Sequence, residues 1–142
     1  MDTIFCLKVS LDTEIYRTIH IRGTASLEKL AEAITRYYGF FFDHAFGFYN
    51  NIDNYYNSTE IYTIFADMND GFGDTEGEGK SVRKIKVSDV FNQGKEMLFL
   101  FDYGDTWLFH IICLDDAIVR EPRKRYPKLV EQKGIAPEQY PD

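Results

Sequence analysis

Two nearly continuous apolar runs, residues 97–102 and 106–114, are joined at a turn that contains Tyr103-Gly104. Strands that are apolar on both faces are typical of the middle of a sheet, where other elements cover them on two sides. A connection this short joins neighbouring antiparallel strands. We therefore predict a central, buried hairpin around which the rest of the chain folds.

Shorter segments with alternating apolar and polar residues predict further strands at 4–11, 16–21, 44–49 and 83–87. The first two are separated only by the polar residues 12–14, which favours a hairpin connection. The sheet is therefore expected to be mainly antiparallel.

The clearest helix is predicted to begin after Ser26 and to end at Gly39. Ser26 can cap the free amides of the first turn, and Gly39 can adopt the left-handed conformation that ends a helix. A second, weaker helix is predicted over 58–67, and Ser88 is expected to cap a single turn through Phe91. One apolar stripe follows the first helix: Leu27, Leu30, Ala31, Ile34 and Tyr38.

All four prolines fall in the last 21 residues, which disfavours a long helix or a central strand there. The tail nevertheless contains apolar residues that need burial. We therefore predict one domain over 1–142, with a body over 1–121 and an extended strap over 122–142 packed on that body. The fold class is α+β: a curved, mainly antiparallel sheet of five to six strands, pseudo-barrel or sandwich-like, with one to two helices.

The 142 residues include 16 basic and 23 acidic side chains, a formal charge of −7. This negative charge disfavours non-specific binding to nucleic acid or to an anionic membrane. No apolar run reaches the roughly 18 residues of a membrane span, and the first residues lack the features of a secretory signal. We expect a soluble, cytoplasmic protein. The tail carries a basic run that favours a solvated surface, with contact to a phosphate or acidic ligand as the alternative: Arg120, Arg123, Lys124, Arg125 and Lys128.

The two cysteines, Cys6 and Cys113, are too far apart in the sequence to form a metal motif, and free buried thiols are expected. Asp67–Gly79 matches neither a phosphate loop nor a calcium loop at the required positions. It is predicted to be a flexible acidic loop, with weak cation binding left open. The sequence therefore implies no cofactor.

Asp102 and Asp105 flank the turn of the central hairpin, just before Trp107. In one interpretation the turn is structural: Gly104 takes a positive φ, and the aspartates accept hydrogen bonds from nearby amides. In the other, a loop of only two residues places both carboxylates opposite each other. A cation, hydrogen-bond donors or a shared proton must then offset their repulsion. A longer loop with a bulge would remove that geometry.

Several parts of the chain match one family in combination. They are Tyr16-Arg17, the helix from Ser26 to Gly39-Phe40, His44 with Phe46, Asp102-Tyr103-Gly104-Asp105-x-Trp107, and the tail residues Tyr126-Pro127, Gly134 and Pro137-Glu138. Together they resemble the plasmid pRiA4b open-reading-frame-three family, whose members are also described as insertion-element passenger proteins (TnpR family).

The resemblance implies an α+β domain of unestablished activity that is associated with plasmids and insertion elements. This chain departs from the family's pattern in two ways. Many relatives have histidine two places after the tryptophan, where this chain has Phe109, followed by His110. Many relatives also carry cysteines in the tail, which this tail lacks. A metal site of His and Cys is therefore not carried over.

The preferred hypothesis is a non-catalytic binding or interaction module with a cleft lined by aromatic and carboxylate side chains. Its partner is an unidentified protein or small molecule, with no membrane involved. The alternative is a metal-dependent hydrolase or nuclease that uses Asp102 and Asp105, and a third hypothesis is nucleic-acid binding through the basic tail. The candidate ligand-binding residues are His44, Asp102, Tyr103, Gly104, Asp105, Trp107 and Glu138.

Overall fold

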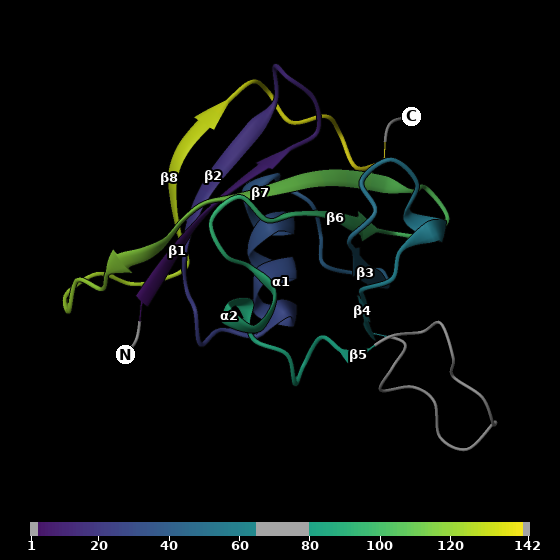
Figure 1. Ribbon diagram of the computed structural model, residues 1–142. Helices are drawn as coiled ribbons and strands as arrows, with labels where there is room; N and C mark the ends of the chain where they lie inside the picture. Colours follow the sequence, from purple (N-terminus) through teal and green to yellow (C-terminus); the bar gives the residue numbers. More distant parts are fainter. Residues whose placement is uncertain (1–2, 65–79, 141–142) are drawn as a thin grey trace.

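The computed structural model describes residues 3–64 and 80–140, and within these ranges the strands form one eight-stranded sheet (Figure 1). The strand order is β5-β4-β3-β6-β7-β1-β2-β8. The strands are β1 (Thr3–Ser10), β2 (Tyr16–Arg22), β3 (Phe46–Tyr49), β4 (Ile61–Thr63), β5 (Lys80–Ser81), β6 (Glu96–Phe101), β7 (Trp107–Val119) and β8 (Lys128–Lys133). The helices are α1 (Leu27–Tyr37), the single turn α2 (Val87–Val90) and the 3-10 turn η1 (Tyr55–Asn57).

The predicted central hairpin is confirmed, because β6 and β7 pair antiparallel and lie in the middle of the sheet. Every neighbouring pair is antiparallel except β4 and β5. The β1–β2 hairpin is also confirmed, with Ser10 opposite Tyr16 at its closed end. The expected mainly antiparallel α+β fold is therefore the observed one.

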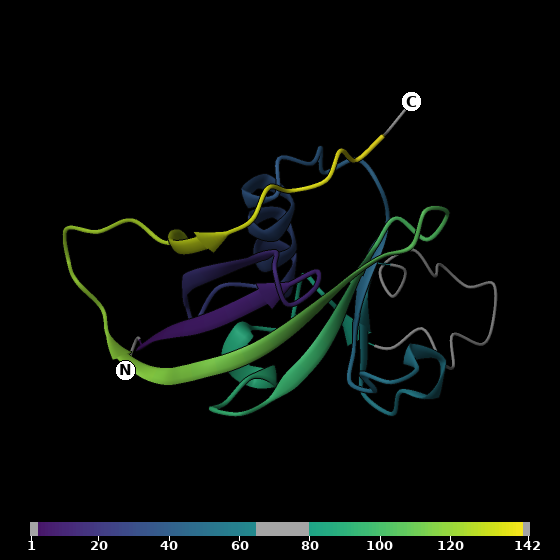
Figure 2. The ribbon, with the colours of Figure 1, turned by 90° about the horizontal axis from the view of Figure 1, so that it is seen from above.

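The sheet curls around α1, which lies on its concave side (Figure 2). As predicted, Ser26 caps α1, its Oγ accepting a hydrogen bond from the Lys29 amide at 3.1 Å. Gly39 follows the helix with a φ of 76°. The apolar stripe of α1 packs into the core together with inward-facing residues of the sheet: Leu27, Leu30, Ala31, Ile34, Val9, Ile19, Ile21, Phe99, Phe109 and Ile111.

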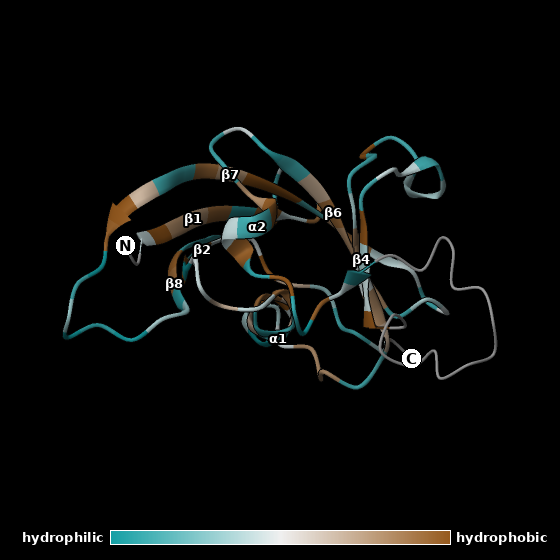
Figure 3. Cartoon of the chain, turned by 60° about the horizontal axis from the view of Figure 1, so that its bottom comes forward, coloured by the Kyte–Doolittle hydropathy of each residue, from teal (hydrophilic) through white to brown (hydrophobic). Residues whose placement is uncertain are grey.

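The other face of the sheet is covered less completely than the sequence predicts. Leu98 and Leu100 of β6 are buried there with Tyr49, against the half-buried Tyr55 and Tyr103. On β7, however, Leu108 and Leu114 are exposed. Hydrophobic colouring is concentrated on β1, β6 and β7, whereas the segment that joins β7 to β8 is hydrophilic (Figure 3). The expectation that both faces of the hairpin are covered is therefore wrong for β7.

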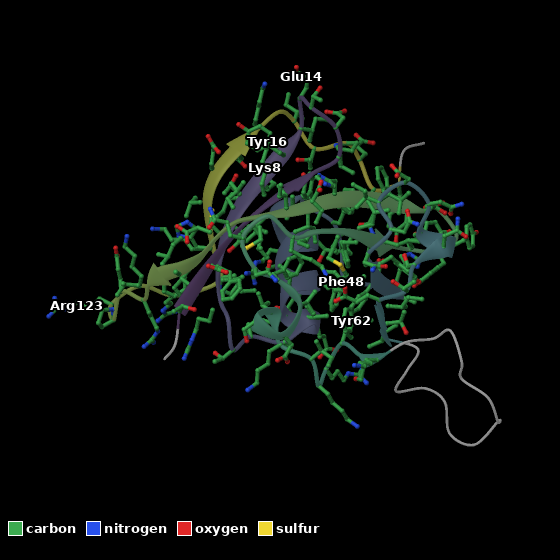
Figure 4. All side chains as sticks on the ribbon, in the orientation of Figure 1. Lys8, Glu14, Tyr16, Phe48, Tyr62 and Arg123 are labelled. Atoms are coloured by element: carbon green, nitrogen blue, oxygen red, sulfur yellow. The ribbon has the colours of Figure 1, made fainter. Side chains whose placement is uncertain are left out.

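The prediction of five to six strands is wrong, because short strands lie at one edge of the sheet and the tail adds another strand at the opposite edge. Residues 61–63, predicted as part of a helix, form β4, in which Tyr62 pairs with Phe48 of β3 (Figure 4). Residues 83–85, predicted as part of a strand, form a turn that leads into α2. Lys86 rather than Ser88 is the cap residue of α2. In residues 61–63, pairing with β3 outweighs the weak helical pattern of the sequence.

The tail contains strand β8, which pairs antiparallel with β2. The prediction of an extended strap did not include this strand. The Tyr37 hydroxyl also donates a hydrogen bond to the Pro127 carbonyl at 3.0 Å. The predicted acidic loop at 67–79 lies outside the described residues. Among residues 3–64 and 80–140, no helix is long and apolar enough to cross a membrane.

Candidate functional site

The hairpin between β6 and β7 is closed by a loop of residues 102–106, because Phe101 and Trp107 form the last pair of the two strands. The Asp102 side chain shapes this loop. Its Oδ1 accepts hydrogen bonds from the Gly104 amide at 3.1 Å and the Asp105 amide at 3.3 Å. The loop is longer than two residues, so Asp102 and Asp105 do not stand opposite each other. The positive φ angles are at Asp102 (65°) and Thr106 (55°), not at Gly104 as the structural interpretation expected.

His44, in the segment between α1 and β3, lies beside this loop and meets the tail. Its Nε2 is 3.4 Å from Asp102 Oδ2 and 3.6 Å from Asp43 Oδ1. The same nitrogen is 2.7 Å from the Tyr140 hydroxyl. Asp102 is buried, with 5% of its surface exposed, whereas His44 and Asp43 reach the surface. We call these four residues, Asp43, His44, Asp102 and Tyr140, the His44 cluster.

The hydrogen bonds of the His44 cluster fix where its protons lie. The Tyr140 hydroxyl donates its one hydrogen to Asp43 Oδ2 at 2.8 Å, so the contact between this hydroxyl and His44 requires a hydrogen on Nε2. Partial burial and the neighbouring Asp43 carboxylate raise the pKa of Tyr140 to about 12, so its hydroxyl keeps its proton near neutral pH. While this network holds, His44 Nε2 has no lone pair for a metal ion or for accepting a proton.

A second set of contacts fixes the backbone of Phe41. The buried Gln139 accepts a hydrogen bond from the Phe41 amide at 2.7 Å and donates one to the Phe41 carbonyl at 3.2 Å. Gln139 also donates to Asp43 Oδ1 at 3.2 Å. Because both backbone groups of Phe41 are held, its position is defined even though its side chain is 72% exposed.

Two more partly exposed aromatic rings accompany Phe41. Phe42 is 38% exposed and stacks on Phe101, with ring centres 6.3 Å apart and an angle of 14° between the planes. Tyr140 is 48% exposed. The exposed Asp105 lies within electrostatic reach, since its charge contributes to the raised pKa of Tyr140. We call Phe41, Phe42, Asp43, Asp105 and Tyr140 the aromatic–carboxylate surface.

The other predicted site residues do not join the His44 cluster. Tyr103 hydrogen-bonds the Tyr49 hydroxyl at 2.5 Å, and burial raises its pKa. Trp107 is half-buried, with its ring edge-on to Phe40 at 4.9 Å. Its Nε1 is buried without a hydrogen-bond partner in the described part of the chain. Glu138 is exposed, and its side chain makes no hydrogen bond or ion pair to another described residue.

Sequence reasoning missed Phe41, Asp43, Gln139 and Tyr140. The one local signal was the polar pair Asp43-His44 directly after three phenylalanines. Nothing in the tail sequence itself indicates that Gln139 and Tyr140 contact residues almost one hundred positions earlier. That contact depends on the path of the tail across the molecule.

The remaining observations concern metals, thiols and cavities. Among residues 3–64 and 80–140, no group of three His, Cys, Asp or Glu side chains is placed to hold a metal ion. Cys6 and Cys113 are free, as expected, and burial raises the pKa of both thiols. Three cavities, of about 280, 250 and 320 Å³, lie elsewhere, and none of them is lined by a residue of the His44 cluster.

Comparisons with known proteins agree with the fold. A family model described as "Plasmid pRiA4b ORF-3-like protein" matches residues 3–140. A search of curated proteins finds no match. Among solved structures, the chain is similar to a protein of unknown function, MM3350, from Methanosarcina mazei Go1, with a TM-score of 0.76 and 23% sequence identity. The similarity covers 96% of this chain and 72% of that one.

Proposed function

The chain belongs to the plasmid pRiA4b ORF-3-like family, and from that starting point we propose that it is a non-catalytic binding module, an accessory protein of the mobile-element type. We propose the aromatic–carboxylate surface as its binding site. The ligand is a positively charged group, such as a lysine or arginine side chain of a partner protein.

The observation that carries this proposal is the exposed side chain of Phe41 on a backbone that Gln139 holds. The Phe41 side chain is large, apolar and 72% exposed, so it gains little free energy from burial. Gln139 meanwhile holds both the amide and the carbonyl of Phe41. Exposed aromatic side chains are typical of contact surfaces, because they offer a large contact area and have only two side-chain angles to restrict on binding.

The neighbouring charges favour a cationic ligand. Asp43 accepts a hydrogen bond from the Tyr140 hydroxyl, and the charge of Asp105 contributes to the raised pKa of the same hydroxyl. A cation gains from both, since the face of an aromatic ring attracts positive charge and a carboxylate forms an ion pair with it. The formal charge of −7 adds a long-range attraction that raises the rate of encounter with a basic partner.

The His44 cluster has a positioning role in this proposal. Asp102 orders the hairpin loop that presents Asp105, and His44 connects that loop to Tyr140 of the tail. Neither residue needs to exchange a proton with a ligand. The hydrogen bonds that Asp102 Oδ1 accepts from the Gly104 and Asp105 amides argue against the metal-dependent alternative, in which Asp102 and Asp105 would hold the metal ion.

Tryptophan fluorescence offers a direct test, because Trp107 is the only tryptophan and lies at the base of the 102–106 loop. The titrant is a blocked peptide of alternating lysine and glycine, and a glutamate–glycine peptide is the charge control. We expect saturable binding of the lysine peptide only, weakened by added salt. Phe41→Ala should weaken that binding by about tenfold, a loss of about 1.4 kcal/mol, without lowering the denaturation midpoint.

Tyr56→Ala is the matched control, since Tyr56 is 80% exposed but lies in η1, outside this surface. It should leave the binding curve unchanged. Equal weakening by both variants, or equal binding of the glutamate peptide, would overturn the proposed site. Tight stoichiometric binding of a divalent metal that Asp102→Asn abolishes would favour the hydrolase alternative.

A further inference from the structure

A cavity of about 250 Å³ lies between the end of β2, the beginning of α1 and the tail. It is separate from the aromatic–carboxylate surface. Its polar lining comes from three different segments: Arg22 at the end of β2, Thr24 and Lys29 around the start of α1, and Tyr126 from the tail. Ile21, Ala25 and Pro127 form its apolar lining.

The wall that the tail contributes is attached to the body. Pro127 is held through its carbonyl by the Tyr37 hydroxyl at 3.0 Å. The next residue, Lys128, begins β8 and pairs with His20 of β2. Farther along, an Arg17 Nη1 group donates to the Lys133 carbonyl at 2.9 Å. The cavity is therefore formed before any ligand arrives.

The surroundings of this cavity are positively charged in a protein whose formal charge is −7. Besides Arg22 and Lys29, the tail brings Lys124 and Lys128 close enough to β2 to help lower the pKa of His20, although burial is the larger cause. Arg123 projects from the same end of the molecule (Figure 4). Glu121 offsets Lys124 locally, at 2.7 Å.

The amides at the start of α1 do not form this site. The Leu27 and Glu28 amides donate to the Ile85 and Val82 carbonyls, and the Lys29 amide donates to Ser26 Oγ. An anion in the cavity would therefore be held by side chains. A guanidinium, an ammonium and two hydroxyl groups from separate segments suit a tetrahedral anion, which accepts hydrogen bonds from several directions.

We propose that this cavity binds the phosphate group of a small phosphorylated molecule. Arg22 and Lys29 supply the charge, and Thr24 and Tyr126 supply hydroxyl donors. The apolar side formed by Ala25 and Pro127 receives the organic part of the ligand. The volume of about 250 Å³ lies below the roughly 300–1,000 Å³ of pockets for drug-sized ligands, which favours a small monoester.

The probes are inorganic phosphate, phenyl phosphate and a short DNA duplex, with binding measured by calorimetry on the full chain. We expect saturable binding of phenyl phosphate, competed by inorganic phosphate. Lys29→Gln should weaken it by about tenfold, the scale of one charge-assisted hydrogen bond. Lys80→Gln, on β5 at the opposite edge of the sheet from β8, is the matched control and should change nothing.

Tyr126→Phe keeps the ring and removes the hydroxyl, so a smaller loss of affinity is expected. The inference is overturned if Lys29→Gln and Lys80→Gln weaken binding equally, or if phenyl phosphate does not bind. It is also overturned if the duplex binds in a salt-dependent way that inorganic phosphate does not compete for. That result would indicate that the basic residues of the tail bind nucleic acid.

Discussion

Asp102 satisfies two requirements of the hairpin loop at once. Its φ of 65° lies in the left-handed region, which aspartate and asparagine tolerate better than most residues. Its carboxylate meanwhile accepts the Gly104 and Asp105 amides and faces His44. The residue is therefore required for its backbone conformation and for its side chain.

Replacing this carboxylate separates its two roles. Asp102→Ala should lower the free energy of unfolding by about 1–3 kcal/mol, because two loop amides lose their acceptor and a strained φ remains. Asp102→Asn keeps an acceptor oxygen and the tolerated conformation, so this variant should lose less free energy of unfolding. Urea denaturation measures the free energy of unfolding of both variants, and the exposed Asp105→Asn serves as the control. Equal losses for the alanine and asparagine variants would contradict this account.

Gly47 is needed for space, not for a positive φ. A Cβ built there would lie 2.7 Å from the Tyr103 hydroxyl and 2.9 Å from Thr63 Cγ2. Gly47→Ala should therefore destabilise the protein by about 1–3 kcal/mol through overpacking, and it should disturb the Tyr49–Tyr103 hydrogen bond. Gly104→Ala is the comparison, since its nearest contact is at 3.4 Å. In thermal unfolding, Gly47→Ala should have a clearly lower melting temperature than Gly104→Ala. The reverse order would contradict the packing explanation.

Glu60 carries a stability contribution that depends on pH. Burial alone would raise its pKa, but hydrogen bonds from Lys95 Nζ and the Tyr62 hydroxyl, both at 2.6 Å, lower it below the ordinary value of 4.5. A lowered pKa in the folded state stabilises the protein above pH 4.5, and this contribution is lost as the pH falls through the folded-state pKa. Glu60→Gln should therefore be less stable than wild type near neutral pH and approach it in acid. Glu121→Gln, which removes a fully exposed ion pair, should show no comparable effect.

At the scale of elements, the tail is the segment whose contribution is easiest to isolate. Truncation after Glu121 removes β8 and the bonds from Tyr37 and Arg17. It should lower the melting temperature by several degrees, since about 1 kcal/mol shifts a domain of this size by a few degrees. Truncation after Lys133 keeps β8 and should cost less, while it abolishes binding at the aromatic–carboxylate surface. An unchanged melting curve for the shorter chain would show that β8 adds no stability.

The elements that the sequence predicted best are those whose stability is local or strongly patterned. The α1 helix has its cap, its apolar stripe and Gly39 within fourteen consecutive positions. The central hairpin is so apolar that it is stable only in the middle of a sheet, where neighbouring elements bury it. By contrast, β4, β5 and β8 are short or polar strands, which form because a neighbouring strand offers hydrogen-bonding groups.

The site was predictable to the same extent. His44, Asp102 and Asp105 were predicted as candidates because the hairpin turn and the segment after α1 carry recognisable polar residues. Phe41 and Gln139 were missed, because their contact joins residues 98 positions apart and depends on the tail's path. Tyr103 and Trp107 were placed in the site by their position in the motif alone. In the structure, Tyr103 of the loop hydrogen-bonds Tyr49, and Trp107 at the start of β7 packs against Phe40.

At the scale of the whole molecule, the two proposed sites lie at opposite ends of the sheet. The 102–106 loop and the last described residues lie at one end, while the basic segment after β7 lies at the other (Figure 1). The two proposed sites therefore face ligands of opposite sign without sharing a residue. A cationic partner at one end and a phosphorylated molecule at the other can be bound at the same time.

The contact of Gln139 with Phe41 also sets an order of events during synthesis. A ribosome releases the segment after α1 about one hundred residues before Gln139 leaves the exit tunnel. Until then the Phe41 backbone lacks the side chain that holds it, and the emerging chain presents an unfinished surface to its surroundings. A partner that requires this surface therefore binds only a chain from which Gln139 has already emerged.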